Sequence, residues 1–285
     1  MTSIVLAYDA GPSAGMGHWR RMQALQQPLA HLGVSAELVE TGGPPLFADV
    51  VVVDSYRHRA DDRERFRANA VAALDDLSRD LRVDVLVDPS PGADSTAHCA
   101  AKRVLAGPHF APLDPCLTLL SPRAVGPEVD IALVATGAAD SAGVGARMAA
   151  ALARLLPRTE VRMALGTWSD GDLPPGVVAV RTETGLGPAL ADADLVLTAA
   201  GVTLLESLAL GRPTVAVILA ENQRRAAGGA AAADAAIVGV EAKAAGLAAE
   251  LAGDLERRRS LSAAARNLVD GRGAGRVAEA IVDLR

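Results

Sequence analysis

One histidine follows a glycine-rich segment at a position where it could act as a general base. Residues 11–17 contain Gly15 and Gly17 and lead to His18, which opens a predicted helix. Glycines allow a tight turn here, and the start of a helix offers free N–H groups and a positive dipole end. Imidazoles titrate close to neutral pH, so His18 could deprotonate a bound nucleophile, with Gly15 and Gly17 as substrate contacts. The alternative is a plain glycine-rich turn beside an incidental histidine.

A second segment combines a site for an anion with a site for a sugar diol. Residues 198–206 follow a predicted strand and open a helix. Gly201 lets the backbone approach a phosphate, and the N–H groups of Val202 and Thr203 could hold a diphosphate. Glu206, one turn further, could accept both hydroxyls of a ribose, which is the spacing that a nucleotide requires. The alternative is a strand-to-helix turn in which Thr203 and Glu206 form a capping box.

Further polar side chains follow other predicted strands. Glu221, Asn222 and Gln223 could bind sugar hydroxyls, or they could form a solvated helix start. The paired carboxylates of Asp75 and Asp76 could position a hydroxyl, or they could cap the following turn. The remaining candidate substrate contacts are Arg21, Tyr56, Gly137 and Ala200.

Short apolar runs alternate with helical stretches and predict an α/β fold with parallel sheets. Predicted strands cover 4–8, 50–53, 71–74, 85–87, 131–136, 161–164, 177–180, 195–197 and 215–219, and predicted helices include 19–32, 144–156, 226–236, 262–269 and 275–284. Five prolines fall within 107–127, a density that suits an extended linker. We therefore expect two Rossmann-like domains, 1–112 and 128–285, joined by 113–127. Ligands of such folds bind at the carboxyl ends of strands, so the site is expected in a cleft between the domains.

Composition excludes several classes of protein. Of 285 residues, 50% are hydrophobic and 22% charged, which rules out a disordered chain. The net charge of −6 makes a general nucleic-acid surface an unfavourable interpretation. No apolar run approaches the length of a membrane span, and no signal peptide opens the chain, so we expect a cytoplasmic protein. Cys99 and Cys116 fit no zinc spacing, and we expect both to be free, buried apolar fillers.

The ordered motifs resemble a group of nucleotide-sugar enzymes. They occupy 15–21, 53–56, 74–77, 87–88, 105–108, 201–206, 211–213, 220–223 and 269–273. They are similar to UDP-2,4-diacetamido-2,4,6-trideoxy-altropyranose hydrolases of the pseudaminic acid route and to spore-coat polysaccharide biosynthesis proteins. Related sequences are described for cytosylglucuronic acid synthases, which are natural-product glycosyltransferases.

This resemblance implies the GT-B fold and a role for each motif. It implies that the N-terminal domain supplies His18 as the base, and that the C-terminal domain binds the nucleotide sugar. It places residues 201–203 at the diphosphate, Glu206 at the ribose, and Asn222 and Gln223 at the transferred sugar. The hydrolases usually carry Gly-Gly-Ser-Thr and a Trp before the ribose glutamate, whereas Val202 and Leu205 stand at two of these positions here.

The departures favour glycosyl transfer narrowly over hydrolysis. The first hypothesis is a metal-independent glycosyltransferase that moves a sugar from a nucleoside-diphosphate donor, UDP-linked by resemblance, to a small acceptor. It would act in cell-surface glycan or natural-product biosynthesis, for example of a nucleoside antibiotic. The alternatives are a UDP-sugar hydrolase that uses water, and a non-catalytic nucleotide-sugar-binding protein. We expect no cofactor, no metal, no nucleic-acid partner, and a monomer or homodimer.

Overall fold

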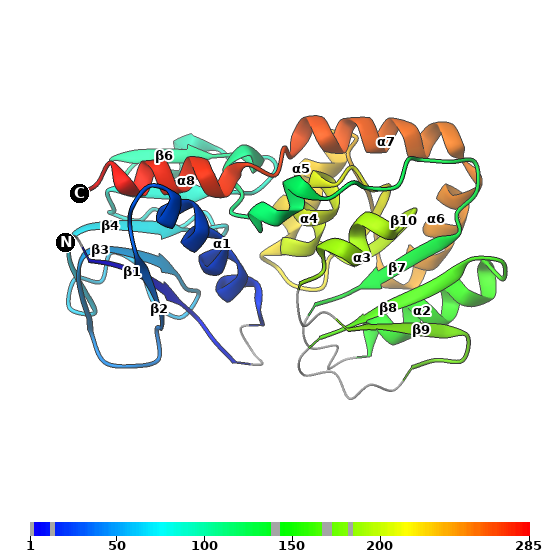
Figure 1. Ribbon diagram of the computed structural model, residues 1–285, viewed down its shortest axis with the longest axis horizontal. Coiled ribbons are helices and arrows are strands. Elements are labelled where there is room, and N and C mark those ends of the chain that lie inside the picture. Colours follow the sequence, from blue (N-terminus) through cyan, green and yellow to red (C-terminus); the bar gives the residue numbers. More distant parts are fainter. Residues whose placement is uncertain (1–2, 12–14, 138–142, 167–172, 182–184) are drawn as a thin grey trace. The chain divides into compact units, whose positions relative to one another are not determined.

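The chain folds into two compact α/β units, each built on a parallel sheet (Figure 1). The computed structural model describes residues 3–285 except 12–14, 138–142, 167–172 and 182–184. The first unit contains residues 1–115 and 271–285, and the second contains residues 116–270. Both sheets are six-stranded within this described part of the chain. The predicted fold class is confirmed.

The first sheet has the strand order β2-β1-β3-β4-β5-β6, with every neighbouring pair parallel. Its strands are β1 (Ile4–Tyr8), β2 (Ala36–Glu40), β3 (Leu46–Asp54), β4 (Phe66–Leu74), β5 (Val85–Asp88) and β6 (Arg103–Ala106). The order reverses at β1, so the carboxyl ends of β1 and β3 flank a topological switch point. Open α/β sheets bind ligands at such points.

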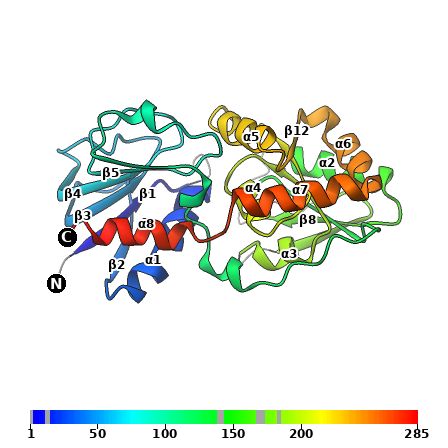
Figure 2. The same ribbon diagram turned by 90° about the horizontal axis from the view of Figure 1, so that it is seen from above.

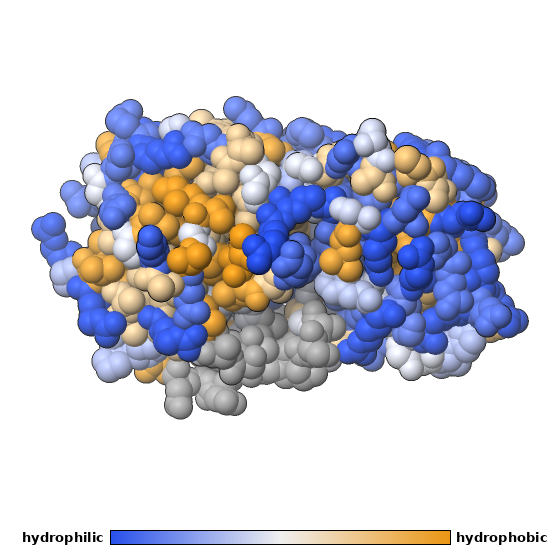
Figure 3. Space-filling model, turned by 180° about the vertical axis from the view of Figure 1, so that it is seen from behind, coloured by the Kyte–Doolittle hydropathy of each residue, from blue (hydrophilic) through white to orange (hydrophobic). Residues whose placement is uncertain are grey.

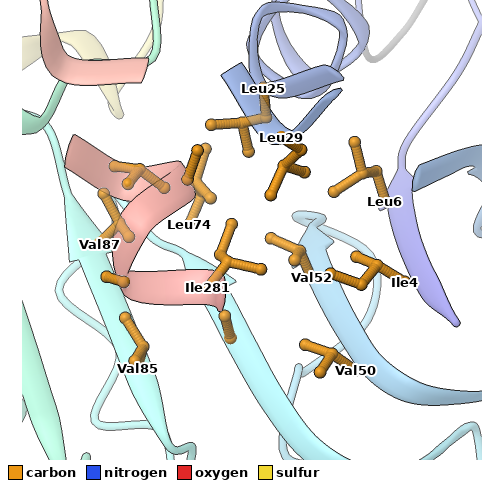
Figure 4. Packing of buried hydrophobic residues seen from close by; sticks show 14 of the residues in the cluster. Ile4, Leu6, Leu25, Leu29, Val50, Val52, Leu74, Val85, Val87 and Ile281 are labelled. Carbon is orange, nitrogen blue, oxygen red and sulfur yellow. The ribbon is translucent and has the colours of Figure 1, made fainter. Parts of the chain in front are cut away.

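Two helices cover one face of this sheet (Figure 4). They are α1 (Gly17–His31) and α8 (Gly273–Val282). Leu25 of α1, Ile281 of α8 and Val52 of β3 belong to one cluster, and all three are fully buried. Val51 and Val53 alternate to the opposite face, which loop residues such as Leu81 cover. The continuous apolar run in β3 follows from this two-sided burial.

Sequence patterns missed the two edge strands of the first sheet. In β2, two glutamates interrupt the apolar residues and the strand is half exposed, and β6 is only four residues long. Edge strands bury less surface than central strands, so their apolar signal is weak. Turns rather than helices connect β3, β4 and β5, contrary to the regular strand-helix alternation that we expected.

The second sheet has the order β12-β11-β10-β7-β8-β9, again parallel throughout. Its strands are β7 (Ile131–Ala135), β8 (Glu160–Leu165), β9 (Val177–Arg181), β10 (Leu195–Ala199), β11 (Thr214–Val217) and β12 (Ile237–Gly239). Its helices are α2 (Val144–Leu155), α3 (Gly187–Asp192), α4 (Val202–Ala209), α5 (Gln223–Ala232), α6 (Glu241–Gly253) and α7 (Leu255–Leu268). Counted from β7, this is the strand order of dinucleotide-binding folds, with the switch point between β7 and β10.

The C-terminal helix belongs to the first unit, not to the second as we predicted (Figures 1 and 2). Val277 and Ile281 of α8 are part of the core over the first sheet. At Gly273, a Cβ atom would lie 2.2 Å from the carbonyl oxygen of Ala111, so only glycine allows this close approach. The predicted second domain, 128–285, therefore includes a segment that the first unit needs to complete its core.

The predicted linker 113–127 is not a free extended segment. Leu117 is buried in the 3₁₀ turn Pro115–Leu119, and its side chain lies against Gly187 of α3. The N–H of Arg123 donates to the carbonyl of Ala191 at 3.0 Å. Most of the segment is thus packed on the second unit.

On the face drawn in Figure 3, an apolar area lies on the second unit, at the left, among hydrophilic residues. Among the described helices, none is long and apolar enough to cross a membrane. Cys99 and Cys116 form no disulfide and are exposed, so the expectation of buried fillers was wrong. Cys99 lies in the turn after the 3₁₀ helix Ser95–His98, where its thiol donates to the carbonyl of Thr96 at 2.9 Å.

Candidate active site

A buried histidine and a buried aspartate form a pair at the switch point of the first sheet. His18 is the second residue of α1, and Asp54 is the last residue of β3. The Nδ1 atom of His18 lies 2.6 Å from Oδ1 of Asp54, and the side chains are 2% and 1% exposed. An ionised carboxylate only accepts hydrogen bonds, so Nδ1 carries a proton, and in the neutral form of the imidazole the lone pair is on Nε2. This is the geometry of a general base that a carboxylate orients.

Arg21 lies one helical turn after His18 and binds the same carboxylate. Its Nε donates to Oδ2 of Asp54 at 2.7 Å, and one terminal nitrogen donates to Oδ1 at 2.8 Å. Burial disfavours the charged form of Asp54, but the charges and hydrogen bonds of Arg21 and His18 outweigh it and lower the pKa of Asp54 to about 2. Asp54 therefore stays ionised at any pH at which the protein is expected to work.

Tyr56 and Asp76 complete the cluster. The ring of Tyr56 meets the imidazole of His18 edge-on, with 4.3 Å between the centroids. Its phenol donates to Asp76 at 2.8 Å, and the second terminal nitrogen of Arg21 donates to the same carboxylate at 2.9 Å. Burial, followed by the charge of Asp76, raises the pKa of Tyr56, so its phenol stays protonated. The ends of α1, β3 and β4 are thereby joined around His18.

Asp75 and Asp76 have different partners, and the substrate contact predicted for Asp75 stays a prediction. Asp75 is buried, and its two oxygens accept the Nε and the backbone N–H of Arg79 at 2.5 and 2.7 Å. Arg79 also donates to the carbonyl of Ser55 at 2.8 Å. Asp75 therefore holds the loops after β3 and β4 together, while Asp76 binds Arg21 and Tyr56, which contact His18. The doublet of aspartates at a strand end was the available signal, but it did not show which member joins the site.

Sequence reasoning also missed Asp9, a buried carboxylate after β1. It accepts the hydroxyls of Thr41 and Ser55 at 2.5 and 2.7 Å. It also accepts the backbone N–H groups of Tyr56 and Arg57 at 2.8 and 3.1 Å. Burial raises its pKa, but these four hydrogen bonds outweigh burial, so the net pKa is lowered. Asp9 fixes the backbone that presents Tyr56.

A second buried histidine, His98, is built differently. Its Nε2 lies 3.3 Å from Oδ2 of Asp88, and its Nδ1 lies 3.2 Å from the carbonyl oxygen of Arg79. Both ring nitrogens of His98 thus face acceptors, whereas for His18 the described residues provide an acceptor at Nδ1. We interpret His98 as a structural residue.

In the second unit, the predicted diphosphate loop follows β10 at the switch point. Gly201 precedes α4 and provides no side-chain cap to the helix, whose first two residues are Val202 and Thr203. Thr203 is inside the helix, so the capping box with Glu206 does not form. Gly137 follows the neighbouring strand β7 and has a φ of +115°, a conformation that favours glycine. Because β7 and β10 are parallel neighbours, Gly137 and Gly201 follow the carboxyl ends of adjacent strands.

Gln223 connects a third loop to this one. Its Oε1 accepts the N–H of Leu219 at 2.8 Å, and its Nε2 lies 3.9 Å from the place of a Cβ on Gly201. Asn222 immediately precedes α5, whereas Glu221 is exposed and paired with Arg224 at 2.6 Å. Glu206 is 5% exposed within α4.

The remaining candidates lie at the start of α1. Gly15 has a φ of +71°, and its N–H donates to the carbonyl of Gly11 at 3.0 Å. Gly17 is the first residue of the helix. Arg21 directs its guanidinium at protein carboxylates, so the structure shows it as a support for His18, and its contact with substrate stays a prediction. In the described segments, no group of three or more His, Cys, Asp or Glu side chains could hold a metal ion.

The structure is similar to solved structures of nucleotide-sugar enzymes, although no family model and no curated protein matches the sequence. The glycosyltransferase of kitacinnamycin has a TM-score of 0.65 at 17% identity, with 99% of each chain covered. The glycosyltransferase SsfS6 from Streptomyces sp. SF2575, complexed with thymidine diphosphate, has a TM-score of 0.61 at 13% identity and covers 98% of this chain and 100% of its own. A putative UDP-N-acetylglucosamine 2-epimerase from Listeria monocytogenes has a TM-score of 0.58 at 13% identity, covering 98% of this chain and 95% of its own.

These likenesses establish the fold of the chain: it has the two-domain GT-B architecture. The fold is shared by a transferase and a putative epimerase, so it does not by itself select the reaction. The choice of reaction depends on the site residues.

Proposed function

We propose that this protein is a glycosyltransferase that moves a sugar from a nucleoside-diphosphate sugar, UDP-linked, to a small acceptor. The observation that carries the proposal is the 2.6 Å contact between Nδ1 of His18 and Asp54, which leaves Nε2 as a base at a ligand-binding edge of the sheet. A protein that only senses a nucleotide sugar has no need of an oriented base in the other unit.

The proposed reaction transfers one proton and one glycosyl group. Nε2 of His18 takes the proton of an acceptor hydroxyl, while the oxygen of that hydroxyl bonds to the anomeric carbon of the donor sugar. The bond between that carbon and the diphosphate oxygen breaks, and the diphosphate leaves with the electron pair. Asp54 stabilises the imidazolium that forms.

The second unit is proposed to hold the donor. The uncapped N–H groups of Val202 and Thr203 would stabilise the departing diphosphate, aided by the dipole of α4. Glu206 would accept the ribose hydroxyls, and Asn222 and Gln223 would bind the transferred sugar. In this proposal no metal ion is needed for the leaving group.

The comparisons support this proposal at the level of chemistry. The neighbours include glycosyltransferases, one of them complexed with thymidine diphosphate, and a structure that contains UDP. An acceptor from natural-product or cell-surface glycan biosynthesis would fit a small-molecule site. Hydrolysis is the second candidate, because His18 could activate water in the place of an acceptor hydroxyl.

The test is release of nucleoside diphosphate from a panel of UDP-sugars and dTDP-sugars, with and without small hydroxyl acceptors and in the presence of EDTA. Release that depends on an acceptor and gives a glycosylated product supports transfer. Release into water at the same rate without acceptor would make the protein a hydrolase. Tight nucleotide binding without any release from the panel would favour a binding protein.

A further inference from the structure

The groups around His18 have charges that can be assigned one by one. Within the described part of the chain, the charged or titratable neighbours are Asp54 from β3, Arg21 from α1, Tyr56 after β3 and Asp76 after β4. Despite burial, which favours their neutral forms, Asp54 is held ionised and the pKa of Arg21 is raised further by Asp54 and Asp76.

The other two neighbours are one anion and one neutral group. Both oxygens of Asp76 accept hydrogen bonds, from the phenol of Tyr56 at 2.8 and 2.9 Å and from Arg21 at 2.9 Å, as an ionised carboxylate does. The pKa of Tyr56 is raised, by burial first, so this residue adds no charge.

Arg21 and His18 share one oxygen of Asp54. Nδ1 of His18 and a terminal nitrogen of Arg21 lie 2.6 and 2.8 Å from Oδ1, and 3.2 Å from one another. Both nitrogens donate to this oxygen, so the guanidinium takes up part of the negative charge that would otherwise hold a second proton on His18. Asp76 accepts from the other terminal nitrogen of the guanidinium. Its negative charge favours a second proton on His18, whereas the charge of Arg21 opposes it.

The net charge of the cluster depends on whether His18 holds a second proton. With a neutral imidazole, one cation and two carboxylates leave the cluster with a single negative charge. Once His18 gains a proton, the cluster is neutral. Arg21 and Asp76 are 9% and 14% exposed, so water screens these charges weakly.

We propose that Arg21 and Asp76 are positioning residues that set the proton affinity of His18 through opposite charges, so that the cluster is neutral when His18 holds the proton of the substrate. That the proton comes from a substrate rests on the proposed function. The charges of the four side chains around His18 do not depend on it. The positive charge of Arg21 opposes a second proton on His18, and the negative charge of Asp76 favours it.

The proposal gives opposite effects for two substitutions and a cancellation for their combination. Arg21→Met leaves two uncompensated negative charges, so His18 should hold its proton to a pH higher by about 1–3 units. Asp76→Asn keeps the shape and acceptor oxygen but removes a negative charge, so His18 should lose its proton at a pH lower by about 1–2 units. In the double variant the cluster has a single negative charge when His18 is neutral, as in the wild-type protein. The titration midpoint of His18 should therefore lie close to the wild-type value.

The experiment is an NMR pH titration of the protein with labelled histidines, in which the signal of His18 is assigned from its absence in His18→Asn. Asp61→Asn is the matched control, because Asp61 is a partly buried carboxylate paired with Arg59 at 3.0 Å in the same unit. The control should leave the His18 midpoint unchanged. Equal midpoints in all variants, or shifts of the same sign in Arg21→Met and Asp76→Asn, would overturn the proposal. If Arg21→Met does not fold, the His18 midpoint in Asp76→Asn is compared with that in Asp61→Asn. A lower midpoint in Asp76→Asn supports the proposal, and an equal one overturns it.

The titration uses no substrate, so it separates this inference from the proposed function. Opposite shifts of the His18 midpoint without turnover of any donor would support the charge balance and refute the function. Where turnover is found, the acid limb of its pH–rate profile should move with the His18 midpoint in each variant. An acid limb that stays in place while the midpoint moves would overturn the role of these residues in the reaction.

Discussion

His18 and Asp54 are 36 residues apart in the chain, and their side chains meet at 2.6 Å. This contact occupies Nδ1 of the imidazole, whereas the proposed nucleotide-binding segment, residues 201–206, belongs to the other unit. His18→Asn should therefore lower kcat by about two to four orders of magnitude and leave the Kd of UDP nearly unchanged. His31→Asn, at the exposed end of the same helix, is the control and should keep full turnover. Weak UDP binding with normal kcat would instead make His18 a ligand contact.

Asp54 should make the stability of the protein depend on pH in the acid range. Its pKa is lowered from 3.8 to about 2, so the folded state holds its proton less tightly than the unfolded state. The resulting stabilisation, about 2 kcal/mol, is present above pH 4 and is lost as the pH falls through about 2. Urea unfolding of the wild-type protein and of Asp54→Asn should show their free-energy difference shrinking by this amount between pH 5 and pH 2. A difference that is constant over this range would contradict the assignment.

Parts of the candidate site could be predicted because they depend on local sequence. The glycine-rich turn before a helix predicted that His18 lies at the helix start. The strand followed by Gly201 predicted the start of α4. The sequence indicated that Asp54 and Asp76 follow strands, but not that Asp54 binds His18 and Asp76 binds Arg21, because these contacts depend on the order of β1, β3 and β4 in the sheet. Periodicity predicts that these strands exist, but it does not determine which of them are neighbours.

The predicted linker shows a second limit of local patterns. Prolines restrict their own backbone and remove N–H donors, which correctly indicates an irregular segment. The partners that hold it lie far away in sequence: Arg212 donates to the carbonyl of Arg123 at 2.7 Å, across 89 residues. Burial, followed by the charge of Arg266, lowers the pKa of Arg212 to about 10, which still leaves it charged at neutral pH. No local sequence pattern predicts such a buried arginine.

Glu206 should contribute to nucleotide affinity through the ribose. It is buried one turn into α4, and Thr203 is not the cap of that helix, so the competing role in a capping box is absent. Glu206→Ala should weaken UDP binding by about 1–3 kcal/mol if two charge-assisted hydrogen bonds are lost. Titration with UDP and 2′,3′-dideoxy-UDP checks the cause, because the variant should no longer distinguish them. Glu250→Gln, an exposed change on α6, should preserve the wild-type preference.

Arg258 should stabilise the second unit by holding the proline-rich segment. The side chain is fully buried on α7, and its terminal nitrogens donate to the carbonyls of Gly126 and Pro127, both at 2.7 Å. Arg258→Met keeps most of the apolar volume but removes both donors, so the free energy of unfolding should fall by about 1–3 kcal/mol. The neighbouring change Arg259→Met removes only an exposed pair with Glu256 and should cost less than about 1 kcal/mol. Chemical unfolding of both variants decides: equal stabilities would mean that the segment is held by its apolar contacts, such as that of Leu117 with Gly187, and not by Arg258.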